Sequence, residues 1–78
     1  MSTNRPIYKI AHEIQDDWKK VNYAAKPYLN AMYGLSDIRD SFHQDSARSI
    51  LTYFLANAST WRGETAKRIK QEIKQLLN

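Results

Sequence analysis

The sequence contains no cysteine in its 78 residues and only two glycines and two prolines. The absence of cysteine excludes disulfides, thiolate zinc sites and cysteine nucleophiles. Because a secreted domain of this size usually relies on disulfides, the composition favours a reducing compartment, which we expect to be the cytoplasm. Few chain-breaking residues and no alternating β-branched runs predict helices rather than a β-sandwich or barrel.

Long apolar segments are also missing. No run approaches the roughly 20 apolar residues that a membrane-spanning helix needs. The first six residues, Met1 to Pro6, lack the apolar segment of a signal peptide. We therefore expect neither a membrane anchor nor a membrane partner.

The side chains that carry most catalytic chemistry are scarce. His12 and His43 are the two histidines, too few for the three protein ligands of a catalytic zinc site, and both are expected at the surface. Asp16 and Asp17 diverge by about 100° on a helix, so their carboxylates cannot share a proton. Glu13 and Asp17 would share a flank, but a general acid–base pair also needs a pocket that separates the two pKa values, and none is expected there. With no glycine-rich phosphate loop, the sequence predicts a non-enzymatic protein with no catalytic residue, metal or cofactor.

The residues that are present suit one folded domain. Hydrophobic residues make up 42% of the chain and charged residues 26%. We expect residues 1–78 to form a single domain with a flexible terminus at residues 1–5. The predicted fold class is all-α, a compact bundle of four short helices joined by short connections.

Apolar spacing of three and four residues places the helices at about residues 6–21, 24–33, 45–58 and 61–77. Pro27 should fall in the first turn of the second helix, and Gly34 should end that helix in a left-handed conformation. Asp45 or Ser46 should cap the third helix, and Ser59-Thr60 the fourth. We also expect helical ion pairs of Asp16 with Lys20, and of Arg68 with Glu64 and Glu72.

The run Trp61-Arg62-Gly63 is the strongest local anomaly. If the fourth helix begins at Trp61, Arg62 points towards the apolar side, where an unpaired charge is costly. One interpretation is a structural clamp that fixes the corner between the third and fourth helices, in which Arg62 pairs with a carboxylate across the bundle (Asp37, Asp40 or Asp45) or stacks on an aromatic ring. The other is an exposed partner-binding site, because Trp and Arg are enriched where binding energy concentrates; this site would comprise Trp61, Arg62, Gly63, Tyr53 and Tyr8.

Positive charge is concentrated near the end of the chain. The net charge is +4, and residues 61–78 alone hold five basic and two acidic side chains. Lys67, Lys70 and Lys74 share one flank of the predicted helix, which is typical either of an ordinary solvated face or of phosphate contacts. The residues of a nucleic-acid interface would be Arg62, Lys67, Lys70 and Lys74.

Five segments of the chain are distinctive when they are taken together: residues 16–21, 25–29, 45–50, 53–58 and the run Trp61-Arg62-Gly63-Glu64-Thr65-Ala66. With these segments the chain resembles a family of short proteins from prophages, plasmids and conjugative elements of Gram-positive bacteria. The resemblance covers nearly the whole chain and implies an accessory protein of a mobile element, located in the host cytoplasm. It carries no established activity and no functional residue.

Three hypotheses of function follow. The first is an inhibitor or modulator that docks by protein–protein contact on a host nucleic-acid machine, such as a restriction or CRISPR nuclease. The second is a DNA- or RNA-binding regulator that uses the basic C-terminal helix. The third is a small structural or oligomerisation subunit. The sequence leaves the partner and the oligomeric state open.

Overall fold

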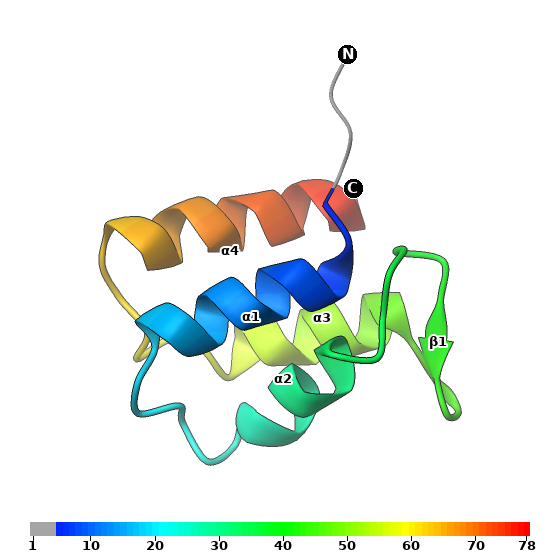
Figure 1. Cartoon of the computed structure of the whole chain (residues 1–78), viewed down its shortest axis with the longest axis horizontal. Coiled ribbons are helices and arrows are strands. Elements are labelled where there is room, and N and C mark those ends of the chain that lie inside the picture. Colours follow the sequence, from blue (N-terminus) through cyan, green and yellow to red (C-terminus); the bar gives the residue numbers. More distant parts are fainter. Residues whose placement is uncertain (1–4) are drawn as a thin grey trace.

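The computed structural model describes residues 5–78, which form four helices and a small hairpin (Figure 1). This arrangement confirms the predicted all-α class with four short helices. Residues 1–4, which belong to the terminus predicted to be flexible, lie outside the described residues. In chain order the elements are α1 (Ile7–Asp17), α2 (Lys26–Met32), β1 (Ser41–Phe42), β2 (Asp45–Ser46), α3 (Ala47–Ala56) and α4 (Glu64–Leu77).

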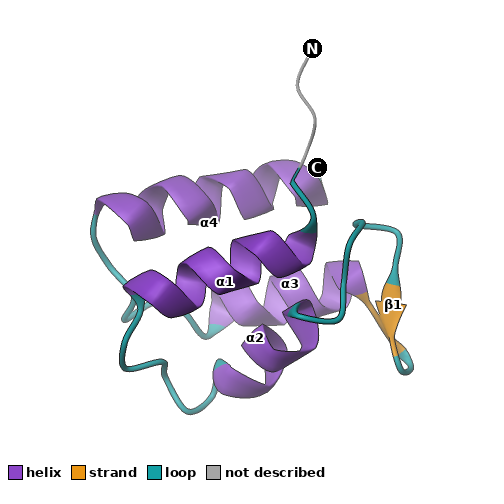
Figure 2. Cartoon of the chain, viewed as in Figure 1, coloured by secondary structure: helices purple, strands orange, loops and turns teal. Residues whose placement is uncertain are grey.

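The helices pack around one core, with α1 in contact with α2 and α4, and α3 in contact with the same two helices (Figure 2). The helices α1 and α4 run antiparallel, so the end of α1 lies beside the start of α4 (Figure 1). The expected apolar stripe is fully buried in α4, where it consists of Ala66, Ile69, Ile73 and Leu76. No helix in residues 5–78 combines the length and the hydrophobicity needed to cross a bilayer.

The first helix ends earlier than predicted, at Asp17 rather than near residue 21. Trp18 leaves the helical conformation, although its backbone N–H still donates to the carbonyl of Ile14 at 2.7 Å. The turn places the Trp18 ring in the core, stacked on Trp61 with ring centroids 5.6 Å apart. Because Lys20 lies beyond the helix, the predicted helical pair of Asp16 with Lys20 is wrong.

The second helix has Pro27 in its first turn, as predicted. The prediction of a left-handed Gly34 is wrong, because in the described residues positive φ angles occur at His43 and Gly63. Gly34 has a different physical role: a Cβ atom there would lie 2.8 Å from the ring of Phe42. The glycine therefore allows the hairpin to pack closely against the end of α2.

The hairpin itself was not anticipated from the sequence. Its two strands pair Ser41 with Ser46 and Phe42 with Asp45, and His43 adopts a φ of 58° in the turn. Ser46 then serves as the N-cap of α3, where its hydroxyl accepts a hydrogen bond from the backbone N–H of Ser49 at 3.1 Å. The predicted cap of the third helix is thereby confirmed.

The fourth helix begins at Glu64, three residues later than predicted, with Gly63 as its N-cap. Gly63 has φ 115° and ψ −179°, a conformation that is accessible essentially only to glycine. The predicted cap at Ser59-Thr60 is therefore wrong. Trp61 and Arg62 lie in the connection before the helix rather than in its first turn.

Candidate functional site

Trp61 is part of the core. Its side chain is only 2% exposed, and its indole Nε1–H donates to the Asp17 carboxylate at 2.8 Å. Trp18 stacks on it, and Phe54 meets the same ring edge-on. The prediction of Trp61 as an exposed anchor for a partner is therefore corrected: the indole closes the end of the core between α1, α3 and α4.

Arg62, the next residue, is exposed. Within residues 5–78 it forms no ion pair or hydrogen bond, so the predicted clamp to the third-helix region is not formed. The Asp37 carboxylate instead pairs with Arg39, and the Asp40 carboxylate accepts the backbone N–H groups of Ser36 and Asp37. The clamp hypothesis assumed that the helix starts at Trp61, and the later start removes its geometric basis.

Arg62 lies at one end of a row of cations. Together with Lys67 and Lys70 it lines a hollow of about 280 Å³, which is completed by Trp61, Gly63 and Ala66. Lys74 follows one turn after Lys70 on the same flank of α4. We call Arg62, Lys67, Lys70 and Lys74 the basic row. In the part of the chain that the structure describes, none of the four forms an ion pair.

Lys70 is the member of the basic row whose ammonium group contacts Trp61. Its Nζ atom donates to the Trp61 carbonyl at 2.7 Å and lies 5.9 Å from the centre of the indole ring. Partial burial lowers the pKa of Lys70, and the nearby charges of Arg62 and Lys74 lower it further. Arg62 and Lys74 thus stand close enough to Lys70 to repel its charge, and an anion at this place would relieve the repulsion.

The opposite flank of α4 has neutralised charges. The guanidinium of Arg5 bridges Glu13 on α1 and Glu72 on α4, with N–O distances of 2.8 Å to each, and Arg68 pairs with Glu13. Hydrogen bonds to Glu72 and then to Glu13 raise the pKa of Arg5, whereas bonds from Arg68 and Arg5 lower the pKa of Glu13. Arg68 thus pairs across to α1, and the predicted pairs with Glu64 and Glu72 within its own helix are wrong. We call the four side chains of Arg5, Glu13, Arg68 and Glu72 the paired cluster.

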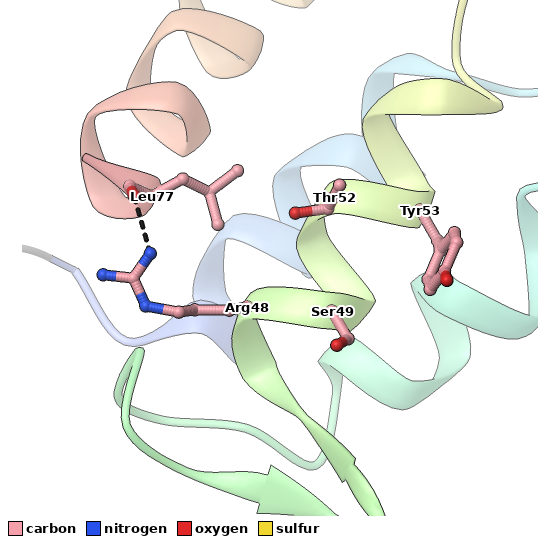
Figure 3. Close-up of a pocket in the computed structure, with 5 residues that line it drawn as sticks. All are labelled: Arg48, Ser49, Thr52, Tyr53 and Leu77. Carbon is pink, nitrogen blue, oxygen red and sulfur yellow. Dashed lines mark hydrogen bonds between the residues drawn. The ribbon is translucent and has the colours of Figure 1, made fainter.

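A second hollow, of about 410 Å³, lies between α3 and the end of α4 (Figure 3). Arg48 reaches across it and donates from Nη1 to the carbonyl of Leu77 at 2.6 Å. The other lining residues, Ser49, Thr52 and Tyr53, present hydroxyl groups from α3. Sequence analysis missed this site, although polar residues at positions 48, 49, 52 and 53 form a stripe opposite the apolar face of α3.

The tyrosines of the predicted partner-binding site are separated from one another. Tyr53 is 54% exposed and lines the second hollow, with its ring stacked on Tyr28 at 5.5 Å. Tyr8 is 37% exposed and lines neither hollow. The structure therefore does not gather Trp61, Arg62, Gly63, Tyr53 and Tyr8 around one hollow.

The two histidines lie at the surface, as predicted. His12 packs edge-on against Tyr33 at 4.9 Å, and His43 packs against Phe42 in the hairpin turn. Among residues 5–78, no three His, Cys, Asp or Glu side chains come together as metal ligands would. Glu13 is engaged in ion pairs and Asp17 accepts the Trp61 hydrogen bond, so each of these carboxylates has a structural partner.

Comparison of the chain with protein-family models, with curated proteins and with solved structures finds no match in any of the three. The resemblance to proteins of mobile elements stays a prediction. Function must therefore be argued from the surface chemistry of this chain.

Proposed function

We propose that this chain is a non-enzymatic protein that binds nucleic acid through phosphate contacts made by the basic row. The observation that carries the proposal is the close grouping of Arg62, Lys67 and Lys70 around one hollow, with no carboxylate among its lining residues. Lysine and arginine side chains that replace condensed counterions along a phosphate backbone supply most of the affinity of such proteins.

The surroundings of the basic row also support phosphate binding rather than a purely solvated face. A solvated lysine usually has a mobile ammonium group, whereas the ammonium of Lys70 is held by the Trp61 carbonyl beside the indole ring. Trp61 is itself fixed in the core, so the hollow has a rigid wall. A preorganised cation loses less side-chain entropy when a phosphate binds.

The test is a salt titration of binding to fluorescein-labelled DNA, both single-stranded and double-stranded, followed by anisotropy. With four cations engaged, the logarithm of the association constant should fall with the logarithm of salt concentration with a slope of about −3 on single-stranded DNA and about −3.6 on double-stranded DNA. A double variant, Lys67→Glu with Lys74→Glu, should weaken binding at least tenfold and reduce the slope by about 2. Lys70 is left intact in this variant because it contacts Trp61.

The matched control is the double variant Lys9→Glu with Lys26→Glu, at two exposed lysines that line neither hollow. Both double variants bring the net charge from +4 to zero, so a general loss of charge affects them equally. We expect the control to bind within threefold of the wild-type protein. Equal weakening by the two variants, or no salt-dependent binding by the wild-type protein, would contradict the proposal.

A second candidate function is inhibition or modulation of a host nucleic-acid machine by protein–protein contact. The exposed Arg62 and the half-exposed Tyr53 support it, because both residue types are enriched at interfaces. The test is co-elution with purified restriction or CRISPR nucleases in gel filtration, together with inhibition of cleavage. The variants Arg62→Ala and Tyr53→Ala should weaken both effects, and unchanged inhibition would remove this candidate.

A further inference from the structure

The two hollows lie along the same flank of α4. Lys70 lines the first hollow and Leu77 lines the second. Lys70, Lys74 and Leu77 are spaced by four and three residues, which places them on one flank of a helix. Lys74 therefore stands between the hollows, and the basic row leads from one to the other.

The helix α3 forms the other side of this path. Ser49 and Thr52 line the second hollow, and Ala56, exposed one turn later, continues their flank of α3 towards the α3–α4 connection. The α3 sequence, Ala47 to Ala56, contains no acidic residue. We call the path between α3 and α4 the α3–α4 strip. It has the lysines of α4 on one side and the hydroxyl groups and Arg48 of α3 on the other, and no carboxylate is among the residues that line its two hollows.

The dimensions of the strip suit a short stretch of nucleic-acid backbone. Lys67 and Leu77 are ten residues apart, which corresponds to about 15 Å along the helix axis. At about 3.4 Å per phosphate along one stacked strand, this length matches about four successive phosphates. Hydroxyl groups such as those of Ser49 and Thr52 are common donors to phosphate oxygens.

Tyr53 adds an aromatic surface to the second hollow, on the side of α3 that faces α2 rather than α4 (Figure 3). One side of its ring is supported by Tyr28, stacked with an angle of 24° between the rings, while about half of the side chain stays exposed. An aromatic ring that is fixed in this way offers a stacking surface to a base. The base pairs inside a duplex are already stacked on one another, so such a ring favours a single strand.

The position of the basic row also disfavours binding of α4 in the major groove of duplex DNA. A recognition helix in the major groove contacts DNA with its outer crest. The crest of α4, opposite its buried stripe, begins at the exposed, acidic Glu64, whereas a recognition helix contacts base edges and phosphates with its N-terminal residues. Lys70 and Lys74 lie instead on the flank beside α3, where a flexible strand can follow them.

We infer that the α3–α4 strip binds single-stranded nucleic acid, with its phosphates along the basic row and one base stacked on Tyr53. This inference rests on the proposed function and extends it from phosphate contacts to the class of ligand. It assigns Tyr53, Thr52 and Ser49 to the same binding surface as Lys67, Lys70 and Lys74.

The experiment compares a labelled oligothymidine with a hairpin duplex of equal phosphate number, at one low salt concentration, by fluorescence anisotropy. Wild-type protein should bind the single strand at least tenfold more tightly. The variant Tyr53→Leu should lose about tenfold in affinity for the single strand, and Tyr53→Phe should keep it, because stacking requires the ring and not the hydroxyl. The control is Tyr23→Leu, at a tyrosine that is 91% exposed and lines neither hollow; it should bind like the wild-type protein.

A second variant makes the result independent of the packing between Tyr53 and Tyr28. Thr52→Glu places a carboxylate at an exposed position in the second hollow, and it should weaken binding of the single strand several-fold. Circular dichroism and urea denaturation of each variant confirm that it is folded.

The outcomes separate the inference from the proposed function. Two results would overturn the inference alone: equal affinity for single strand and duplex, or wild-type affinity in both Tyr53→Leu and Thr52→Glu. In either case the proposed function would stand if the double variant Lys67→Glu with Lys74→Glu still weakened binding. Absence of salt-dependent binding to either ligand would overturn the proposed function and the inference with it.

Discussion

Arg68 and Lys74 lie six residues apart on α4, and both are exposed, yet their charges have opposite surroundings. Arg68 pairs with Glu13 on α1, in a cluster that also contains Arg5 and Glu72. Lys74 belongs to the basic row, whose four cations form no ion pair within residues 5–78. The comparison shows that whether a charged side chain of α4 is paired within the fold depends on which helix packs beside it.

The neighbouring elements explain the difference. The helix α1 supplies a carboxylate opposite α4, and Arg5, just before α1, bridges that carboxylate to Glu72. The helix α3 supplies hydroxyl groups and no carboxylate, so the flank of α4 beside it keeps its positive charge. One flank thus contributes to the fold, and the other is available to a ligand.

The largest expected effect is a loss of stability when Trp61, the buried residue beneath the basic row, is replaced. Trp61→Ala removes a buried indole that stacks on Trp18 and binds Asp17, so it should lower the free energy of unfolding by about 3–5 kcal/mol. Urea denaturation followed by circular dichroism measures it. The control is the adjacent Arg62→Ala, which should change stability by less than about 0.5 kcal/mol because the side chain is exposed and unpaired in residues 5–78. Similar losses in the two variants would show that Trp61 is not a core residue.

A smaller effect should follow from changing the start of α4. Gly63→Ala should cost about 1–3 kcal/mol, because alanine does not readily adopt φ 115° with ψ −179°. The cost is strain of the local backbone, since apart from Gly63 and its chain neighbours no heavy atom lies within 4 Å of the added Cβ. The same denaturation assay applies, and a stability equal to that of the wild-type protein would contradict the observed backbone conformation.

Matched charge reversals on the two flanks test the comparison itself. Arg68→Glu places a carboxylate beside Glu13 and should cost about 1 kcal/mol of stability with little effect on DNA binding. Lys74→Glu makes the same change in net charge on the other flank; it should alter stability by less than about 0.5 kcal/mol and should weaken DNA binding. If the two variants lose stability and DNA affinity to the same extent, the division into a structural flank and a ligand-binding flank would be contradicted.

The smallest effect concerns pH and the paired cluster. Hydrogen bonds from Arg68 and Arg5 keep the pKa of Glu13 below its ordinary value of 4.5 in the folded protein. A carboxylate with a depressed folded-state pKa stabilises the fold above its unfolded-state pKa, and this contribution is lost as the pH falls through the folded-state pKa. The stability difference between wild type and Glu13→Gln should therefore be below about 1 kcal/mol at neutral pH and should vanish in acid. A difference that grew as the pH fell below 4 would contradict the pairing.

Patterns within single helices were predictable from the sequence. The apolar stripes, Pro27 in the first turn of α2 and the Ser46 cap of α3 all depend on neighbours within a few residues. The boundaries of α1 and α4 were less accurate, because Trp18 and Gly63 leave the helical conformation for reasons of packing and backbone geometry. The hairpin was missed because each of its strands has only two residues, too few for a periodic signal.

The candidate site was predictable only in part. The spacing of Lys67, Lys70 and Lys74 on one flank followed from helix geometry. The burial of Trp61 did not, because its partner Asp17 is 44 residues away in the sequence. The same holds for the bond between Arg5 and Glu72, which are 67 residues apart. Such contacts are set by tertiary packing, which local patterns do not specify.

The most direct test of the difference between the two flanks is a nuclear magnetic resonance titration of ¹⁵N-labelled protein with a short oligothymidine at low salt. Amide shifts should concentrate at residues 61–77 on the flank beside α3 and at residues 48–53, whereas Arg5, Glu13 and the α1 side of α4 should stay unchanged. Shifts centred on the paired cluster, or spread evenly over the surface, would contradict the assignment of the α3–α4 strip as the binding surface.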